Sequence, residues 1–130
     1  MKEIMPIPMT SLTRSHRRAL VVGADPATLR FCRDALESSG FAVHAVDTGI
    51  AAVVAAREEL PDLIFVDAQL HDFPGREAIK WLRSIPALQS MPIIVLTAEA
   101  EDDARTRQTP SLQKPVSVAA IWRTIHEVLE

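Results

Sequence analysis

The sequence is poor in the features that mark secreted, metal-clustered or membrane-spanning proteins. Its single cysteine, Cys32, can form neither an internal disulfide nor a cysteine cluster, and such a chain is typical of the reducing cytoplasm. No apolar run approaches the roughly 18 residues that a membrane span requires. The first ten residues contain Pro6 and Pro8 and no continuous apolar stretch, so no signal peptide is predicted. A cytoplasmic location is therefore expected.

The chain also lacks an excess of positive charge. Its 14 lysines and arginines stand against 17 acidic residues, a net charge of −3, which argues against a nucleic-acid partner. The 130 residues, 48% hydrophobic and 24% charged, have the composition of one globular domain with its own core. Residues 1–18 show no clean periodicity, so we predict a disordered tail over 1–18 and a folded domain over 19–130.

From residue 19 onward, short apolar runs alternate with segments of helical spacing. Such runs are typical of strands that are buried on both faces of a sheet. The predicted strands are 19–22, 41–46, 63–66, 92–96 and 111–113. A helical segment follows each strand, and the fourth of these segments, 99–107, is charged and predicted to be short. This order predicts an α/β fold, a (βα)5 doubly wound parallel sheet with helices on both faces.

Capping residues and apolar stripes define the predicted helices. Asp25, Thr48 and Ser117 are predicted to cap helix N-termini, and Gly40 is predicted to end the first helix. The predicted apolar faces are Leu29, Cys32, Ala35 and Leu36; Ile50, Val53, Val54 and Leu60; Ala78, Ile79, Leu82 and Ile85; and Val118, Ile121, Trp122, Ile125, Val128 and Leu129.

Three polar side chains lie where predicted strands end. Asp67 follows the third strand, Thr97 the fourth and Lys114 the fifth. Ligands of doubly wound sheets bind beyond the carboxyl ends of the strands, so these groups are expected at one rim. A carboxylate can attack phosphorus as a nucleophile, while a hydroxyl and an ammonium group stabilise phosphoryl oxygens. The arrangement therefore suits phosphoryl transfer.

Residues 19–130 resemble the receiver domain of a response regulator of the chemotaxis-regulator type. The matching stretches are 61–67, 92–98 and Lys114-Pro115, and Thr97 lies 30 positions after Asp67, as in the family. The resemblance implies a flavodoxin-like sheet of strand order 2-1-3-4-5. It implies that Asp67 is the phosphoacceptor, Thr97 the switch hydroxyl and Lys114 the phosphate-contacting lysine. It further implies a histidine kinase or histidine phosphotransfer protein as partner, and a cis Lys114–Pro115 bond.

The chain departs from the family pattern where the first strand ends. Family members carry an acidic pair there that holds Mg²⁺, whereas this chain has Gly23 and Ala24. The remaining candidate ligands are Asp67, the backbone carbonyl of Gln69 and Asp25, which would have to reach back and is favoured as a helix cap. Because Mg²⁺ needs near-octahedral oxygen coordination, we expect Mg²⁺ binding to be weak or absent.

A second departure affects the face that would signal to a target. Lys114 lies only 17 positions after Thr97, fewer than usual, so the helix at 99–107 is shortened. The chain has no tyrosine, and the usual switch aromatic of the fifth strand is replaced near Ser111. We expect a downstream protein to bind the face formed by the 99–107 helix, the fifth strand and the last helix, with a homodimer as a further possibility.

Two functions stay open from the sequence. The first is a receiver domain that accepts a phosphoryl group on Asp67 and switches a protein-binding surface. The alternative is a pseudo-receiver that binds partners without phosphorylation. A flavodoxin-like cofactor binder is disfavoured because residues 23–26 do not form a phosphate-cradling loop. A hydrolase is disfavoured because no serine or cysteine nucleophile lies at a strand end beside a base.

Overall fold

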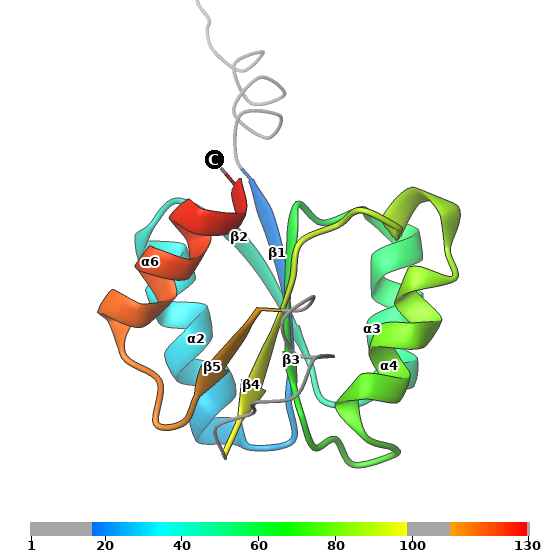
Figure 1. The fold of residues 1–130 in the computed structure, drawn as a ribbon, viewed down its shortest axis with the longest axis horizontal. Helices are drawn as coiled ribbons and strands as arrows, with labels where there is room; N and C mark the ends of the chain where they lie inside the picture. Colours follow the sequence, from blue (N-terminus) through cyan, green and yellow to red (C-terminus); the bar gives the residue numbers. More distant parts are fainter. Residues whose placement is uncertain (1–16, 99–109, 130) are drawn as a thin grey trace, which may run out of the picture.

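The computed structural model describes residues 17–98 and 110–129, which form a five-stranded parallel sheet of order β2-β1-β3-β4-β5 (Figure 1). The strands are β1 (Arg18–Val22), β2 (Ala42–Val46), β3 (Leu63–Asp67), β4 (Ile93–Thr97) and β5 (Ser111–Gln113). The predicted fold class and strand order are confirmed. The tail predicted over 1–18 and the helix predicted over 99–107 fall wholly or mostly outside the described residues.

Helices cover both faces of the sheet. The described helices are α2 (Pro26–Ser38), α3 (Gly49–Glu58), α4 (Gly75–Arg83), the short 3-10 helix η1 (Pro86–Leu88) and α6 (Val118–Leu129). Figure 1 shows α2 and α6 on one side of the sheet and α3 and α4 on the other. Within residues 17–98 and 110–129, no helix has the length and apolar character needed to cross a membrane.

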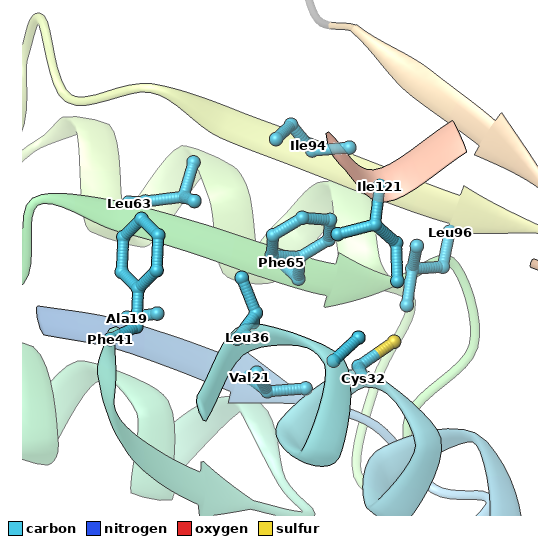
Figure 2. Packing of buried hydrophobic residues seen from close by; sticks show 11 residues of the cluster. Ala19, Val21, Cys32, Leu36, Phe41, Leu63, Phe65, Ile94, Leu96 and Ile121 are labelled. Atoms are coloured by element: carbon cyan, nitrogen blue, oxygen red, sulfur yellow. The ribbon is translucent and has the colours of Figure 1, made fainter. Parts of the chain in front are cut away.

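The two layers have separate hydrophobic cores, as the alternation of side chains along each strand requires. Ala19 and Val21 of β1 face α2 and α6, where they pack with Leu36, Phe65 and Ile121 (Figure 2). The next residues of the same strand, Leu20 and Val22, face α3 and α4. All five residues of β3 are buried, which explains why its sequence reads as a continuous apolar run ending in Asp67.

The predicted caps form as expected. Thr48 Oγ1 accepts a hydrogen bond from the Ala51 N–H at 3.0 Å, and Ser117 Oγ accepts one from the Ala120 N–H at 3.1 Å. Asp25 caps α2, with Pro26 as its first residue. Gly40 follows the end of α2 with a φ of 95°, in the left-handed region that favours glycine. These local signals fix where the helices begin and end.

The predicted apolar face of α3 is wrong for three of its four residues. Of the residues that were to be buried, Ile50 is 54% exposed and Val54 and Leu60 are each 48% exposed. The buried residues of α3 are instead small: Gly49, Ala52, Ala55 and Ala56. Small side chains let the helix backbone approach the sheet closely, so the alanines make the main contact; of the predicted face, Val53 packs against the core, whereas Ile50 and Val54 point outward.

The predicted stripe of α6 is only partly buried. Ile121 is fully buried, and Ile125, Val128 and Leu129 pack against the same core. Val118 and Trp122, in contrast, are each 46% exposed. A stripe that spans all six residues is wider than the strip of helix surface that faces the sheet, so its outer members reach solvent.

The connection from α4 to β4 is held by one side chain. Arg83 Nη1 donates hydrogen bonds to the backbone carbonyls of Leu88, Gln89 and Met91, at 3.1, 3.1 and 2.6 Å. Burial lowers the pKa of the Arg83 guanidinium. These bonds tie the Arg83 side chain of α4 to three carbonyls in and after η1, one of which, that of Leu88, also accepts from the Met91 N–H.

Overpacking the alanine face of α3 should destabilise the fold. We expect Ala56→Leu to lower the free energy of unfolding by about 1–3 kcal/mol, because Ala56 is fully buried against the sheet. Val54→Ala, on the exposed side of the same helix, should change it by less than about 0.5 kcal/mol. Urea unfolding of the two variants measures the difference. Equal losses would contradict the orientation of α3.

Candidate functional site

The polar rim predicted from the sequence lies at the carboxyl ends of β3, β4 and β5. Asp67 is the last residue of β3, Thr97 is the last residue of β4, and Lys114 directly follows β5. The backbone N–H of Lys114 donates to the Thr97 carbonyl at 2.7 Å, and the N–H of Ala68 donates to the Leu96 carbonyl at 2.7 Å. Backbone hydrogen bonds therefore tie these three strand ends together.

Asp67 and Lys114 form a close ion pair across 47 positions of sequence. Lys114 Nζ lies 2.6 Å from Asp67 Oδ2, while Asp67 Oδ1 accepts a hydrogen bond from the Gln69 N–H at 3.1 Å. The Asp67 side chain is only 2% exposed and that of Lys114 is 25% exposed. A carboxylate this deeply buried needs a charged or hydrogen-bonded partner, and Lys114 provides it. Thr97, 5% exposed, is also buried at this rim.

Gly23, at the end of β1, faces the same carboxylate. A Cβ placed on Gly23 would lie 3.6 Å from Asp67 Oδ2 and 3.5 Å from Leu29 Cδ2, which are ordinary contact distances. The backbone of position 23 therefore has room for a Cβ beside Asp67. Neither Gly23 nor its neighbour Ala24 offers a side-chain oxygen, so β1 contributes no side-chain metal ligand to this rim.

Asp25 is engaged as the cap of α2. Its Oδ1 accepts a hydrogen bond from the Ala27 N–H at 3.1 Å, and its Oδ2 accepts one from Thr28 Oγ1 at 2.6 Å. The hydrogen bond from Thr28, followed by that from Ala27, lowers the pKa of the Asp25 carboxyl. The preference for a capping role over a metal-ligand role is thus supported, because both carboxylate oxygens already have donors.

The residues at this rim do not fit a magnesium site with two or more carboxylates. Within the described ranges, no group of three or more His, Cys, Asp and Glu residues is placed to hold a metal ion. The oxygens that remain beyond β3 are those of Asp67 and the backbone carbonyl of Gln69. Mg²⁺ is usually held by one or two carboxylates plus water and phosphate, and the carboxylate available at this rim, that of Asp67, is already paired with Lys114.

The loop between β3 and α4 passes close to the backbone of Asp67. A Cβ on Gly75 would collide with the Asp67 carbonyl oxygen, so a glycine is required at this close approach. The Gly75 N–H donates to the Ala68 carbonyl at 2.8 Å, and Gln69 and Pro74 form an isolated antiparallel bridge. The loop that follows Asp67 is therefore closed by backbone contacts between its two ends.

Asp72 fixes the other end of this loop to α3, a role that the sequence analysis missed. Its Oδ1 and Oδ2 accept hydrogen bonds from the N–H groups of Gly49 at 2.9 Å and Ile50 at 3.1 Å. Desolvation raises the pKa of Asp72, but the hydrogen bonds from Gly49, Ile50 and Phe73 outweigh it and leave that pKa below its ordinary value. Asp72 lies 23 positions from Gly49, so no local pattern marked the contact.

Three further features concern Phe73, Cys32 and the Lys114–Pro115 bond. The Phe73 ring covers Gly49 so closely that a Cβ there would collide with it, and its centroid lies 5.0 Å from that of Trp81. Cys32 is fully buried in the core beneath α2, as predicted (Figure 2). Burial, aided by the negative charge of Asp67, raises the pKa of the Cys32 thiol to about 11. The Lys114–Pro115 bond is cis, as predicted.

Comparison with known proteins agrees with this geometry. The sequence model of the response regulator receiver domain matches residues 19–122. The polar-differentiation response regulators DivK of Brucella ovis and Brucella anthropi are each 34% identical over 118 residues, which cover 87% of this chain and 96% of the relative.

Solved structures give the same result. The receiver domain of the sensor histidine kinase PA1611 from Pseudomonas aeruginosa, with a magnesium ion in its active-site cleft, aligns with a TM-score of 0.78 and 27% identity. The alignment covers 88% of this chain and 98% of that one. The chemotaxis protein CheY4 of Vibrio cholerae, at 22% identity, shares the fold with a TM-score of 0.81 over 88% of this chain and 99% of its own.

The ion pair at the rim should be measurable as a coupling energy. Lys114→Met leaves the buried Asp67 carboxylate without its counter-charge, so we expect a loss of about 1–3 kcal/mol in unfolding free energy. The double variant Asp67→Asn/Lys114→Met should lose less than the sum of the single variants, by about 1 kcal/mol or more. Urea unfolding of the four proteins gives the cycle. Additive losses would contradict the interaction.

A control for this cycle is the exposed pair of α4. Lys80 Nζ lies 4.0 Å from Glu77 Oε2, with 75% of the Lys80 side chain exposed. Because solvent screens such a pair, Lys80→Met should change the unfolding free energy by less than about 0.5 kcal/mol.

The lowered pKa of Asp72 predicts a pH-dependent contribution to stability. A depressed pKa in the folded state stabilises above the unfolded pKa, near 3.8, and this stabilisation is lost as the pH falls through the folded pKa. Asp72→Asn should therefore lose about 0.5–1 kcal/mol at pH 7, and the gap to the wild type should close below the ordinary pKa. Unfolding free energies between pH 2 and pH 7 test this. A gap that is constant with pH would contradict it, and Asp34→Asn, on exposed α2 surface, is the matched control.

Proposed function

This chain belongs to the response regulator receiver domain family, and we propose that Asp67 is its phosphoryl acceptor. The donor in this proposal is a phosphohistidine of a histidine kinase or of a histidine phosphotransfer protein in the cytoplasm. The observation that carries the proposal is the buried Asp67 carboxylate at the carboxyl end of β3, with Lys114 Nζ 2.6 Å from Oδ2.

The proposed transfer needs a carboxylate nucleophile and positive charge near the phosphoryl oxygens. A carboxylate oxygen of Asp67 forms the new bond to phosphorus, the phosphorus–nitrogen bond of the phosphohistidine breaks, and the released imidazole takes up a proton from solvent. Lys114 would then move its hydrogen bonds from the carboxylate to the phosphoryl oxygens. Thr97, at the end of the neighbouring strand, would contact a further phosphoryl oxygen in the modified state.

We propose that this acceptor works with weak Mg²⁺ binding. The PA1611 receiver domain holds a magnesium ion in its cleft, whereas the end of β1 in this chain supplies Gly23 and Ala24. Asp25 has both carboxylate oxygens bonded within α2. Lys114 therefore provides the neutralising charge at Asp67, and the rate of phosphorylation should depend little on Mg²⁺.

The output surface in this proposal includes the outer side of α6. Val118 and Trp122 are each 46% exposed there. A partner protein that covers α6 would bury both side chains. Lys114 connects the rim to this side of the molecule, since it lies in the short segment of chain between β5 and α6. A change in the hydrogen bonds of Lys114 would thus be passed to β5 and α6, where a downstream protein binds.

Phosphorylation of the purified protein tests the proposal. Phosphoramidate carries a phosphorus–nitrogen bond like that of phosphohistidine, so we expect it to add the mass of one phosphoryl group to the wild type. Mass spectrometry should find the group on Asp67, and Asp67→Asn should stay unmodified. Lys114→Met should be modified at least about tenfold more slowly, the effect of losing ~1.4 kcal/mol of charge stabilisation.

A variant with a restored acidic pair tests whether the ends of β1 and β3 can bind Mg²⁺ and support phosphorylation. Gly23→Asp/Ala24→Asp places two carboxylates at the end of β1, where the backbone of position 23 has room for a Cβ beside Asp67. We expect its Mg²⁺ affinity to rise at least about tenfold, by ~1.4 kcal/mol of added charge attraction, as measured from the amide shifts of Asp67 and Gln69. If this variant is phosphorylated and the wild type is not, the natural domain acts as a phosphorylation-independent binding module.

A further inference from the structure

A groove runs between α2 and the β2 edge of the sheet, and neither Asp67 nor Lys114 lines it. It has a volume of about 410 Å³ and is lined by side chains of α2, including Leu29, Arg30 and Arg33, and by the end of β2 at Ala45 and Val46. β2 is an outermost strand of the sheet (Figure 1). The groove therefore combines a helix surface with an open strand edge.

The backbone of β2 leaves hydrogen-bonding groups directed away from the sheet. The Ala42 N–H donates to the Arg17 carbonyl at 2.8 Å, and the Val46 carbonyl accepts from the Gly23 N–H at 3.0 Å. Since the N–H and C=O of one strand residue point to the same side and alternate along the strand, Ala42, His44 and Val46 face β1. Val43 and Ala45 then direct theirs outward, where no strand in the described part of the chain pairs with them.

Among the described residues, β2 lacks the lysine, proline and short length that commonly protect an edge strand against pairing. Edge strands are commonly shortened, or carry lysine, proline or inward-pointing charges that block another strand. The opposite edge strand, β5, has only three residues. β2 has five residues, Ala42–Val46, and none of them is proline, lysine or acidic.

The groove beside this edge has an excess of positive charge. Arg30 and Arg33 lie one turn apart on α2, both exposed, and neither forms an ion pair or hydrogen bond with a residue in the ranges 17–98 and 110–129. Asp47, at the end of the groove, supplies one carboxylate against the two guanidinium groups. The groove thus favours an occupant that carries more than one negative charge.

We propose that an extended acidic segment of a partner protein adds to β2 as a sixth strand. Its backbone would bond to the outward N–H and C=O groups of Val43 and Ala45, and its carboxylates would face Arg30 and Arg33. Alternate side chains of a strand lie about 6.6 Å apart on one face, and three helical residues rise about 4.5 Å, so two alternate acidic residues lie within reach of the two arginines.

A second copy of this chain is a poorer occupant of the same edge. Antiparallel pairing of two β2 strands about a two-fold axis perpendicular to the sheet would place both α2 helices on one face. Arg30 and Arg33 of the two copies would then approach one another, and like charges at such an interface are unfavourable. The carboxylates of an acidic segment would instead attract Arg30 and Arg33.

A designed peptide tests the proposal on the full chain. The probe is a capped heptapeptide that alternates glutamate with valine and threonine, and its control has lysine in place of each glutamate. We expect the glutamate peptide to shift the amide NMR signals of 43–47 and 30–33. Binding should weaken with salt, and the lysine peptide should bind at least about tenfold less tightly.

Variants test the charge contact with Arg30 and Arg33 and the backbone contact with β2 separately. Arg30→Glu/Arg33→Glu should weaken the glutamate peptide at least about tenfold, whereas Arg57→Glu, an exposed charge reversal on α3 across the sheet, should not. Ala45→Pro removes an outward N–H that β1 does not use, so the domain should fold and the peptide should lose affinity. Asp67→Asn should bind the peptide as the wild type does, which separates this site from the phosphoryl acceptor.

Several results would overturn the proposal. These are no shift at millimolar peptide, shifts confined to another surface, equal binding of the glutamate and lysine peptides, or equal losses in the Arg57→Glu and Arg30→Glu/Arg33→Glu variants. If raising the protein concentration alone shifts the Val43 and Ala45 amides, the edge pairs with a second copy. If an oligothymidylate shifts them and the glutamate peptide does not, the arginines bind phosphate.

Discussion

The ion pair between Lys114 and Asp67 is the interaction on which the arrangement of the candidate site depends. A carboxylate that is only 2% exposed is unfavourable without a partner, and its partner here is the residue that directly follows β5. The pair can form only if β3, β4 and β5 end at the same level, as the hydrogen bonds of Ala68 to Leu96 and of Lys114 to Thr97 ensure. The register of these three strands therefore determines whether Lys114 can reach Asp67 at the rim.

Gly23 and Ala24, at the end of β1, determine the charge balance at this rim because neither side chain carries a charge. An additional carboxylate at position 23 would lie close to Asp67, and a divalent cation would offset the repulsion between the two. With Gly23 and Ala24, one carboxylate faces one ammonium group, and the rim is already neutral. The loop beyond Asp67 is held separately, by the close approach at Gly75 and by Asp72 at the N-terminus of α3.

The sequence predicted the local signals and, from the strand ends, the meeting of Asp67 with Lys114, but it missed other contacts between distant segments. The strand runs, the caps at Asp25, Thr48 and Ser117, and the positive φ of Gly40 follow from neighbouring residues, and the structure agrees with them. The contacts of Asp72 with α3 and of Arg83 with three carbonyls join segments whose proximity no short pattern reveals. The buried face of α3 was mistaken because hydrophobicity favoured Ile50 and Val54, whereas close helix–sheet packing selects alanine.

The two surfaces singled out in this domain use different properties of one sheet. At the carboxyl ends of β3, β4 and β5, side chains converge, so modification of one residue there changes the partners of the others. At the outer edge of β2, the backbone itself is available, and Arg30 and Arg33 of α2 add selectivity for charge. The outward-facing backbone of β2 is separated from β3 and Asp67 by β1, although Gly23, at the end of β1, bonds to the Val46 carbonyl and faces Asp67. A partner held at β2 could therefore remain bound while the rim changes state.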